Sequence, residues 1–277
     1  MASKSLVVVG KGRMGAALYA NLRPWYSPAL HLPGRAVVGR APKRPKQSPV
    51  TWILAVSDRA IPLVCDALAP SVEPGDCAFH LAGMLGPEVL ASMKARGARV
   101  ASLHPLYAVA AAEPRITALS APAFVFEGDR AALAEARKVA RRCQGALVAA
   151  SRVDRARYHG AAALMATGAV ALAQGAARLF AESLTPRPTD TQLRVMTGSL
   201  LRSVAVNVNA VGLDRALASP LLREDTETVA RHLAAMDAEP AVRDLYRAAV
   251  AFVLEALERN ALVSPETIAQ ARALVKR

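Results

Sequence analysis

The sequence predicts an α/β fold with a doubly wound sheet, followed by an all-helical C-terminal domain. Short β-branched runs alternate with helical patterns through the first half of the chain. A glycine-rich turn follows the first of these runs, and strand patterns stop after Ser151. We therefore expect an α/β domain over residues 1–151 and a helical domain over residues 152–277.

The first strand pattern, SLVVV at residues 5–9, ends at the turn GKGRMG. In a G-x-G-x-x-G turn the first glycine makes a tight bend, the second lets a pyrophosphate approach the backbone, and the third lets the next helix pack closely. Phosphates then lie at the positive end of that helix. The turn predicts a dinucleotide site, with a structural glycine turn as the alternative, and its residues are Gly10, Gly12, Arg13, Met14 and Gly15.

The remaining elements follow from periodicity. Strands are expected at residues 36–39, 51–56, 77–81, 98–103, 122–127 and 145–150. Helices are expected at residues 13–23, 59–69, 87–96, 129–143, 153–183, 189–206, 222–236, 240–260 and 265–276. Three prolines in RAPKRPKQSPV, residues 40–50, exclude a regular helix between the second and third strands. A loop is expected there.

The composition is typical of a globular protein of the cytoplasm, with 53% hydrophobic and 21% charged residues. Three cysteines without C-x-x-C spacing indicate neither a disulfide framework nor a zinc site, and the histidine spacings indicate no metal site. The apolar run before Gly10 is too short for a signal peptide. The uncharged segment Gly160–Ala177 is rich in Ala and Gly, which favours a buried helix over a membrane span.

The first 57 residues contain nine Lys and Arg and no Asp or Glu. An aromatic content of 4% disfavours nucleic acid as the partner and leaves a small anionic ligand. NAD sites place a carboxylate after the second strand, whereas NADP sites place cations there. Arg40 follows the expected second strand, and Lys43 and Arg44 follow in the loop. The sequence therefore predicts NADP(H), with solvated loop cations as the alternative.

Hydride transfer is performed by the cofactor, so the protein must position a carbonyl or imine carbon and supply a proton. His104 follows an expected strand at the edge where ligands bind, and His159 lies near the start of the long helix. A structural hydrogen bond is the alternative for each histidine. Val56, Ser57 and Asp58 follow the third strand and are expected to line the cofactor, although Asp58 is also a candidate helix cap.

Several segments resemble one known family, and they are GKGRMG at 10–15, VVGR at 37–40, LAVSD at 54–58, HLAG at 80–83, SLHPL at 102–106, YHGAA at 158–162 and ALASPLLREDTETVARHL at 216–233. The chain resembles the Rossmann-like family with a C-terminal helical domain of unknown function, which is related to pyrroline-5-carboxylate reductases and 6-phosphogluconate-dehydrogenase-like enzymes. The resemblance implies a helical domain that packs against the cofactor domain and forms homodimers, with a cleft between the domains.

Two departures from that family concern catalysis. Family members usually have Asn at the position of Thr167, whose hydroxyl still forms hydrogen bonds. Related dehydrogenases often use a Lys on the long helix, whereas this chain has none between Lys138 and Lys276.

We expect an NADP(H)-dependent oxidoreductase that reduces a C=O or C=N bond of a small substrate. His159 or His104 would donate the proton, and Thr167 would orient the substrate. Arg223 and Asp225 are candidates for substrate binding, with a helix-start ion pair as the alternative. The other function that the sequence leaves open is an NADP(H)-binding sensor or scaffold without turnover.

Overall fold

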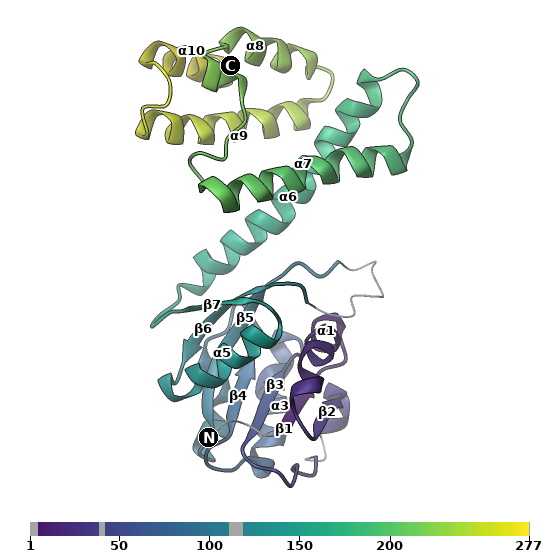
Figure 1. Ribbon diagram of the computed structural model, residues 1–277, viewed down its shortest axis with the longest axis vertical. Helices are drawn as coiled ribbons and strands as arrows, with labels where there is room; N and C mark the ends of the chain where they lie inside the picture. Colours follow the sequence, from purple (N-terminus) through teal and green to yellow (C-terminus); the bar gives the residue numbers. More distant parts are fainter. Residues whose placement is uncertain (1–4, 39–41, 111–118, 277) are drawn as a thin grey trace. The chain divides into compact units, whose positions relative to one another are not determined.

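The computed structural model describes residues 5–38, 42–110 and 119–276. A seven-stranded sheet with helices on both faces is followed by a helical part, which confirms the predicted fold class (Figure 1). The chain forms two compact units, Met1–Ala163 and Leu164–Arg277. The first unit extends beyond residue 151 because it includes the start of helix α6 (Arg155–Ser183).

The sheet has the strand order β2–β1–β3–β4–β5–β6–β7. The strands are β1 (Ser5–Val9), β2 (Ala29–Leu32), β3 (Val50–Leu54), β4 (Cys77–His80), β5 (Arg99–Leu106), β6 (Ala123–Gly128) and β7 (Ala146–Ala149). The first five strands are parallel, whereas β6 is antiparallel to β5. The described residues between β5 and β6 contain no crossover helix, the connection that a parallel neighbour would need.

The second strand lies at residues 29–32, so the predicted strand at 36–39 is wrong. Pro33 follows β2, and the next residues form the short helix α2 (Gly34–Val37). Val37 is buried beneath the sheet rather than paired within it. The sequence ALHL contains no β-branched residue, and only its pairing with β1 makes it a strand.

Helices cover both faces of the sheet. The helices of the first unit, besides α2, are α1 (Arg13–Leu22), α3 (Ile61–Leu68), α4 (Ala91–Ala95) and α5 (Leu133–Arg142), with short 3₁₀ turns between them. Successive side chains of β1 alternate between the faces: Val8 packs with α1 and α5, and Val7 packs with α3 and α4. This two-sided burial explains why the strand is apolar throughout.

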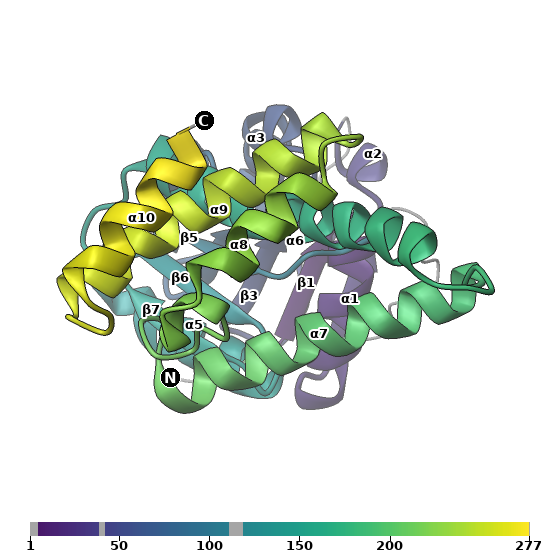
Figure 2. The same ribbon diagram turned by 90° about the horizontal axis from the view of Figure 1, so that it is seen from above.

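The second unit is helical, as predicted. Besides most of α6 it contains α7 (Asp190–Val211), α8 (Thr226–Ala235), α9 (Pro240–Arg259) and α10 (Pro265–Lys276). The last three helices pack around a core that includes Val229, Leu254 and Ile268 (Figure 1, Figure 2). Helix α7 begins with a capping box in which Thr189 and Gln192 bond reciprocally.

The apolar segment Gly160–Ala177 lies in α6. The prediction that this segment is buried is wrong. Within α6 the buried residues are Gly175 and Ala181. The helix is long and apolar enough to cross a membrane, by length and composition only. Of its most apolar 18-residue window, 6% is buried. The prediction is wrong because the second unit packs its core around α8, α9 and α10, which leaves α6 largely uncovered within one chain.

A buried carboxylate organises the amino edge of the sheet. Asp76 precedes β4 and is fully buried. Its oxygens accept hydrogen bonds from the Val50 amide at 2.8 Å and from the Trp52 indole N–H at 3.0 Å. The Arg44 guanidinium binds the same carboxylate in bidentate fashion at 2.5 and 2.9 Å. This ion pair joins the proline-rich loop to the starts of β3 and β4.

We expect Asp76→Asn to lower the free energy of unfolding by about 3 kcal/mol, because the substitution leaves the Arg44 charge beside a neutral amide. Urea denaturation at neutral pH measures this loss. Glu73 is the matched control, since its carboxylate also pairs with Arg44, at 3.0 Å, but is 58% exposed. Glu73→Gln should change the stability by less than about 1 kcal/mol.

The effect of Asp76→Asn should depend on pH. Burial raises the pKa of the Asp76 carboxyl, but the hydrogen bonds from Arg44, Val50 and Trp52 outweigh burial and hold it below its ordinary value. A lowered pKa stabilises the fold at neutral pH, and this contribution is lost as the pH falls below about 4. The difference between wild type and variant should therefore shrink in acid. Equal stabilities at pH 7 would contradict this assignment.

Candidate functional site

The glycine turn lies at the carboxyl edge of the sheet, where β1 meets β3. Gly10 has a φ of +120°, and a Cβ atom there would lie 2.1 Å from the Ala55 carbonyl oxygen. A Cβ on Gly15 would lie 2.0 Å from the Gly10 carbonyl oxygen. A Cβ on Gly12, by contrast, would meet no described atom within 4 Å. Two glycines are thus required by packing, and Gly12 borders open space.

Helix α1 begins at this open space. Gly12 is its N-cap residue and offers no capping side chain, and the first turn contains no acidic residue. Arg13 and Met14 occupy the first two helical positions. The N–H groups of a first helical turn have no partner within the helix, and they carry its positive end. This arrangement suits a phosphate group.

The end of β3 forms the adjacent wall of the site. Val56 is half-buried, whereas Ser57 and Asp58 are exposed. A Cβ on Gly34 would lie 2.9 Å from Cγ1 of Val56, so the turn after β2 reaches the same edge. Asp58 begins a short 3₁₀ helix (Asp58–Ala60). The three residues predicted to line the cofactor therefore lie beside the glycine turn.

Of the three predicted cations, the two that the structure describes, Lys43 and Arg44, lie away from this site. Arg40 lies outside the described residues. Arg44 binds Asp76 at the opposite edge of the sheet, so its assignment to the cofactor is wrong. Lys43 is exposed beside it, and the neighbouring Pro42 carbonyl accepts a hydrogen bond from Ser71. The backbone at Lys43 thus lies at the amino edge as well, and the structure does not bring Lys43 to the glycine turn.

Arg35 is a cation that lies close to the carboxyl edge. It is the second residue of α2, three positions after the end of β2, and it is exposed. Its neighbour Gly34 contacts Val56 at the carboxyl edge. A cation after the second strand is the feature that favours a 2′-phosphate. The sequence signal was the Pro-Gly pair in ALHLPGR, which marks the end of a strand.

A cluster of three side chains lies further along the same edge. Strand β5 continues past β4, because Ser102 pairs with the last residue of β4. His104 therefore lies beyond the end of β4, within β5 rather than after it as predicted. Its Nδ1 lies 2.6 Å from the Tyr158 hydroxyl. The ring centroids of His104 and His159 are 6.3 Å apart.

Gly83 brings the backbone after β4 against these rings. A Cβ at this position would lie 2.6 Å from Cδ2 of His159 and 3.1 Å from Nε2 of His104. Any larger residue would displace one of the imidazoles. The glycine of HLAG is therefore part of the cluster, and sequence reasoning did not assign it this position.

His80 shapes the turn that carries Gly83. It is fully buried, with Nε2 donating to the Gly86 carbonyl at 3.0 Å and Nδ1 accepting from the Ala82 amide at 3.2 Å. Burial lowers its pKa to about 4, so it is neutral at physiological pH. Its role is structural.

An ion pair fixes the start of α6 on the sheet. Arg155 binds the Glu127 carboxylate of β6 and donates to the Ser102 hydroxyl at 3.2 Å. Glu127 also accepts from the Val153 amide at 3.0 Å. Tyr158 lies about one helical turn after Arg155. This anchor holds Tyr158 and its neighbour His159 beside β5.

Electrostatics distinguish the two histidines. Burial, together with the smaller effects of the nearby His159 and Arg155, lowers the pKa of His104 to about 4. Burial raises the pKa of the Tyr158 hydroxyl to about 12. We assign the Tyr158 hydroxyl as donor to Nδ1, which leaves Nε2–H on a neutral His104. Because His104 is neutral, it can donate a hydrogen bond but is a poor source of a proton. His159, by contrast, is exposed to solvent.

The other predicted residues lie in the second unit. Thr167 is exposed on α6, and Arg223 is exposed at the end of a 3₁₀ turn (Pro220–Arg223). Asp225 is the N-cap of α8, and its two oxygens accept from the amide and hydroxyl of Thr228 at 2.9 and 2.6 Å. This cap accounts for Asp225 structurally. The substrate roles of all three residues stay predictions.

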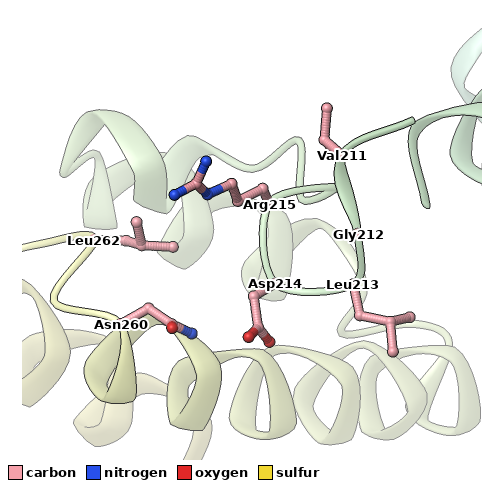
Figure 3. A pocket seen from close by; sticks show the side chains of 7 residues that line it. All are labelled: Val211, Gly212, Leu213, Asp214, Arg215, Asn260 and Leu262. Atoms are coloured by element: carbon pink, nitrogen blue, oxygen red, sulfur yellow. The ribbon is translucent and has the colours of Figure 1, made fainter. Parts of the chain in front are cut away.

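A pocket of about 310 Å³ in the second unit is separate from these residues. It lies between the end of α7 and the turn after α9, and its lining is Val211, Gly212, Leu213, Asp214, Arg215, Asn260 and Leu262 (Figure 3). Asp214 accepts a hydrogen bond from Arg259 at 3.1 Å. None of the residues predicted to bind cofactor or substrate lines it. In the described ranges, no group of three His, Cys, Asp or Glu is placed to hold a metal ion.

Solved structures share this fold at low sequence identity. Protein TM1727 of Thermotoga maritima has a TM-score of 0.62 at 21% identity, over 92% of this chain and 99% of its own. A pyrroline-5-carboxylate reductase of Coxiella burnetii has 0.52 at 15%, over 99% of both chains. An imine reductase of Myxococcus stipitatus, in complex with NADP⁺, has 0.52 at 18%, over 92% and 94%.

No curated protein matches this chain in sequence. Residues 122–252 match the family model described as "Domain of unknown function (DUF2520)". That segment begins just before β6 and ends within α9. It therefore includes the start of α6 that carries Tyr158 and His159. Residues 122–252 are similar to this family, whose description assigns no function.

Proposed function

We propose that the protein is an NADP(H)-dependent oxidoreductase that reduces a C=O or C=N bond of a small substrate. The observation that carries this proposal is the position of two features on one sheet edge: the open glycine turn after β1 and the histidine cluster beyond β4. Strands β1, β3, β4 and β5 are neighbours in that order. At about 4.8 Å per strand the two features are about 15 Å apart, a span that an extended dinucleotide covers.

The adenosine end of the proposed site favours the phosphorylated cofactor. Arg35 follows β2, and a guanidinium binds phosphate in bidentate fashion. The described residues after β2 include no Asp or Glu before Asp58. The NADP⁺ complex of the imine reductase, which has the same fold, supports the choice.

In the proposed reaction the cofactor supplies hydride to the carbonyl or imine carbon. The Nε2–H of His104 donates a hydrogen bond to the substrate oxygen or nitrogen and polarises the double bond. His159 delivers the proton to that atom, because it is exposed and lies beside His104. The sequence-based roles of Thr167 in orienting the substrate, and of Arg223 and Asp225 in binding it, are part of this proposal.

We also propose that the protein works as a homodimer in the cytoplasm. Tyr158–Ala177 contains no Asp, Glu, Lys or Arg. Large apolar side chains are exposed on α6 and α7, among them Leu164, Met165, Val170, Leu172, Val195, Leu200, Val204 and Val206. An apolar surface of this extent marks an interface. A second copy is the proposed occupant, as the family resemblance implies.

The alternative function is an NADP(H)-binding sensor or scaffold without turnover. The observation that favours it is the composition of the helical half. The resemblance implies an Asn at the position of Thr167, and no Lys occurs between Lys138 and Lys276. Cofactor binding without any turnover would support this alternative.

The cofactor assignment predicts that two exposed cations differ in their effect on NADPH binding. They are Arg35, which follows β2, and Lys43 of the proline-rich loop. Arg35→Ala should weaken NADPH binding about tenfold and leave NADH binding unchanged, since only NADPH carries the 2′-phosphate. Lys43→Ala is the matched control and should leave both affinities unchanged, because Lys43 lies at the amino edge. Fluorescence titration measures the dissociation constants. Tighter binding of NADH than NADPH by the wild type would refute the assignment.

The catalytic assignment is tested by following NADPH oxidation with keto acids, cyclic imines and aldehydes. On an active substrate, His159→Ala should lower kcat by about 10²-fold or more, because the proton source is lost. Tyr158→Phe should lower kcat less, since it removes only the hydrogen bond that orients His104. The control is His232→Phe in the second unit, which should retain activity. Full activity in both His159→Ala and His104→Ala would show that the cluster is not catalytic.

The proposed dimer is tested by light scattering after size-exclusion chromatography. Val204→Asp on α7 should shift the mass from dimer to monomer, because it places a charge in the apolar surface. Leu63→Asp is the matched control: Leu63 is also exposed, at 60%, but lies on α3 of the first unit. A wild-type monomer, or a dimer that both variants retain, would count against the interface.

A further inference from the structure

His31 of β2 contacts the glycine turn from the side. Its Nε2 lies 2.9 Å from the Gly10 carbonyl oxygen. A carbonyl oxygen only accepts, so this nitrogen carries the hydrogen. The imidazole stacks on the Tyr19 ring of α1, with centroids 4.7 Å apart and planes at 22°. The Tyr19 hydroxyl in turn donates to the Ala29 carbonyl of β2 at 3.1 Å. His31 is thus held between β2 and α1 with its donor directed at the turn.

The hydrogen bond from His31 is a side-chain contact to a peptide group that backbone packing also holds. Gly10 donates its own N–H to the Leu32 carbonyl at 2.8 Å, and its carbonyl oxygen lies close to Gly15. Its φ of +120° lies in a region that glycine enters freely and other residues rarely adopt. In a trans peptide the Gly10 carbonyl and the Lys11 N–H point in opposite directions. Holding the carbonyl toward β2 therefore directs the Lys11 N–H away from it and orients the start of the turn.

We propose that His31 is a positioning residue of the dinucleotide site, which fixes the Gly10–Lys11 peptide so that the turn accepts a pyrophosphate. This inference rests on the proposed binding of NADP(H). His31 serves the part of the ligand that NADPH and NADH share, whereas Arg35 serves the 2′-phosphate. The two residues therefore have separable effects on cofactor affinity.

The test compares two substitutions that differ in the donor. His31→Phe keeps a flat ring on Tyr19 and removes the N–H group. His31→Gln keeps an amide N–H near the position of Nε2. His31→Phe should weaken NADPH and NADH by the same factor, about 3- to 10-fold, the effect of one hydrogen bond. His31→Gln should restore affinity to within about twofold of wild type.

A matched control comes from the second unit. His232 places Nδ1 2.9 Å from the Tyr246 hydroxyl, so it is another histidine paired with a tyrosine. His232→Phe should leave both dissociation constants unchanged.

Three results would overturn the inference. Wild-type affinity in His31→Phe would show that the donor is not needed, and an equal loss in His31→Gln would show that only the ring matters. If His31→Phe does not fold, ¹⁵N NMR of the wild-type imidazole decides: a hydrogen on Nδ1 instead of Nε2 excludes the bond. Wild-type protein that binds neither nucleotide would instead reject the proposed function, and this inference with it.

Discussion

The close approach of three backbones at the end of β1 determines much of the first unit. The Gly10 amide donates to Leu32 of β2, and the Ala55 amide donates to Val9 at 2.7 Å. Helix α1 packs so tightly that Gly15 has no room for a side chain. These contacts join β2, β1 and β3 at one point and direct the start of α1 toward open space. A Cβ at either glycine would separate the strands and move the helix, so the binding geometry and the fold depend on the same contacts.

The charged side chains at the two edges of the sheet have different surroundings: one arginine is paired with a buried carboxylate, and the other is exposed. At the amino edge, Arg44 is neutralised by buried Asp76, and the pair links a loop to two strands. At the carboxyl edge, Arg35 is exposed. The sequence contains no Asp or Glu before Asp58. A buried ion pair contributes to stability only while both partners remain, whereas an exposed cation is available to a ligand. Arg44 of the proline-rich loop therefore serves the folding of the sheet, and Arg35 is the exposed cation that we propose for the phosphate.

Much of this architecture was predictable from the sequence, because strands buried on both faces and helices with apolar stripes leave clear periodic patterns. The glycine turn was equally clear, since packing requires its residues. The second strand was missed because ALHL has no β-branched residue, and that error placed the predicted cations at Arg40, Lys43 and Arg44, after the wrongly predicted strand at residues 36–39. Tyr158 and Gly83 were missed for another reason. Their importance comes from contacts across 54 and 76 residues of chain, with His104 and His159 respectively, which periodicity does not encode.

We propose that the carboxyl edge of the sheet, from the glycine turn to the histidine cluster, is one dinucleotide site. Hydrogen exchange of the wild-type protein with and without NADPH tests it most directly. With NADPH bound, we expect slower amide exchange in peptides that cover residues 10–15, 55–58 and 81–84. Residues 43–48 and 73–76 at the amino edge should show no change in exchange. Protection confined to the amino edge, or no protection at saturating NADPH, would contradict the account.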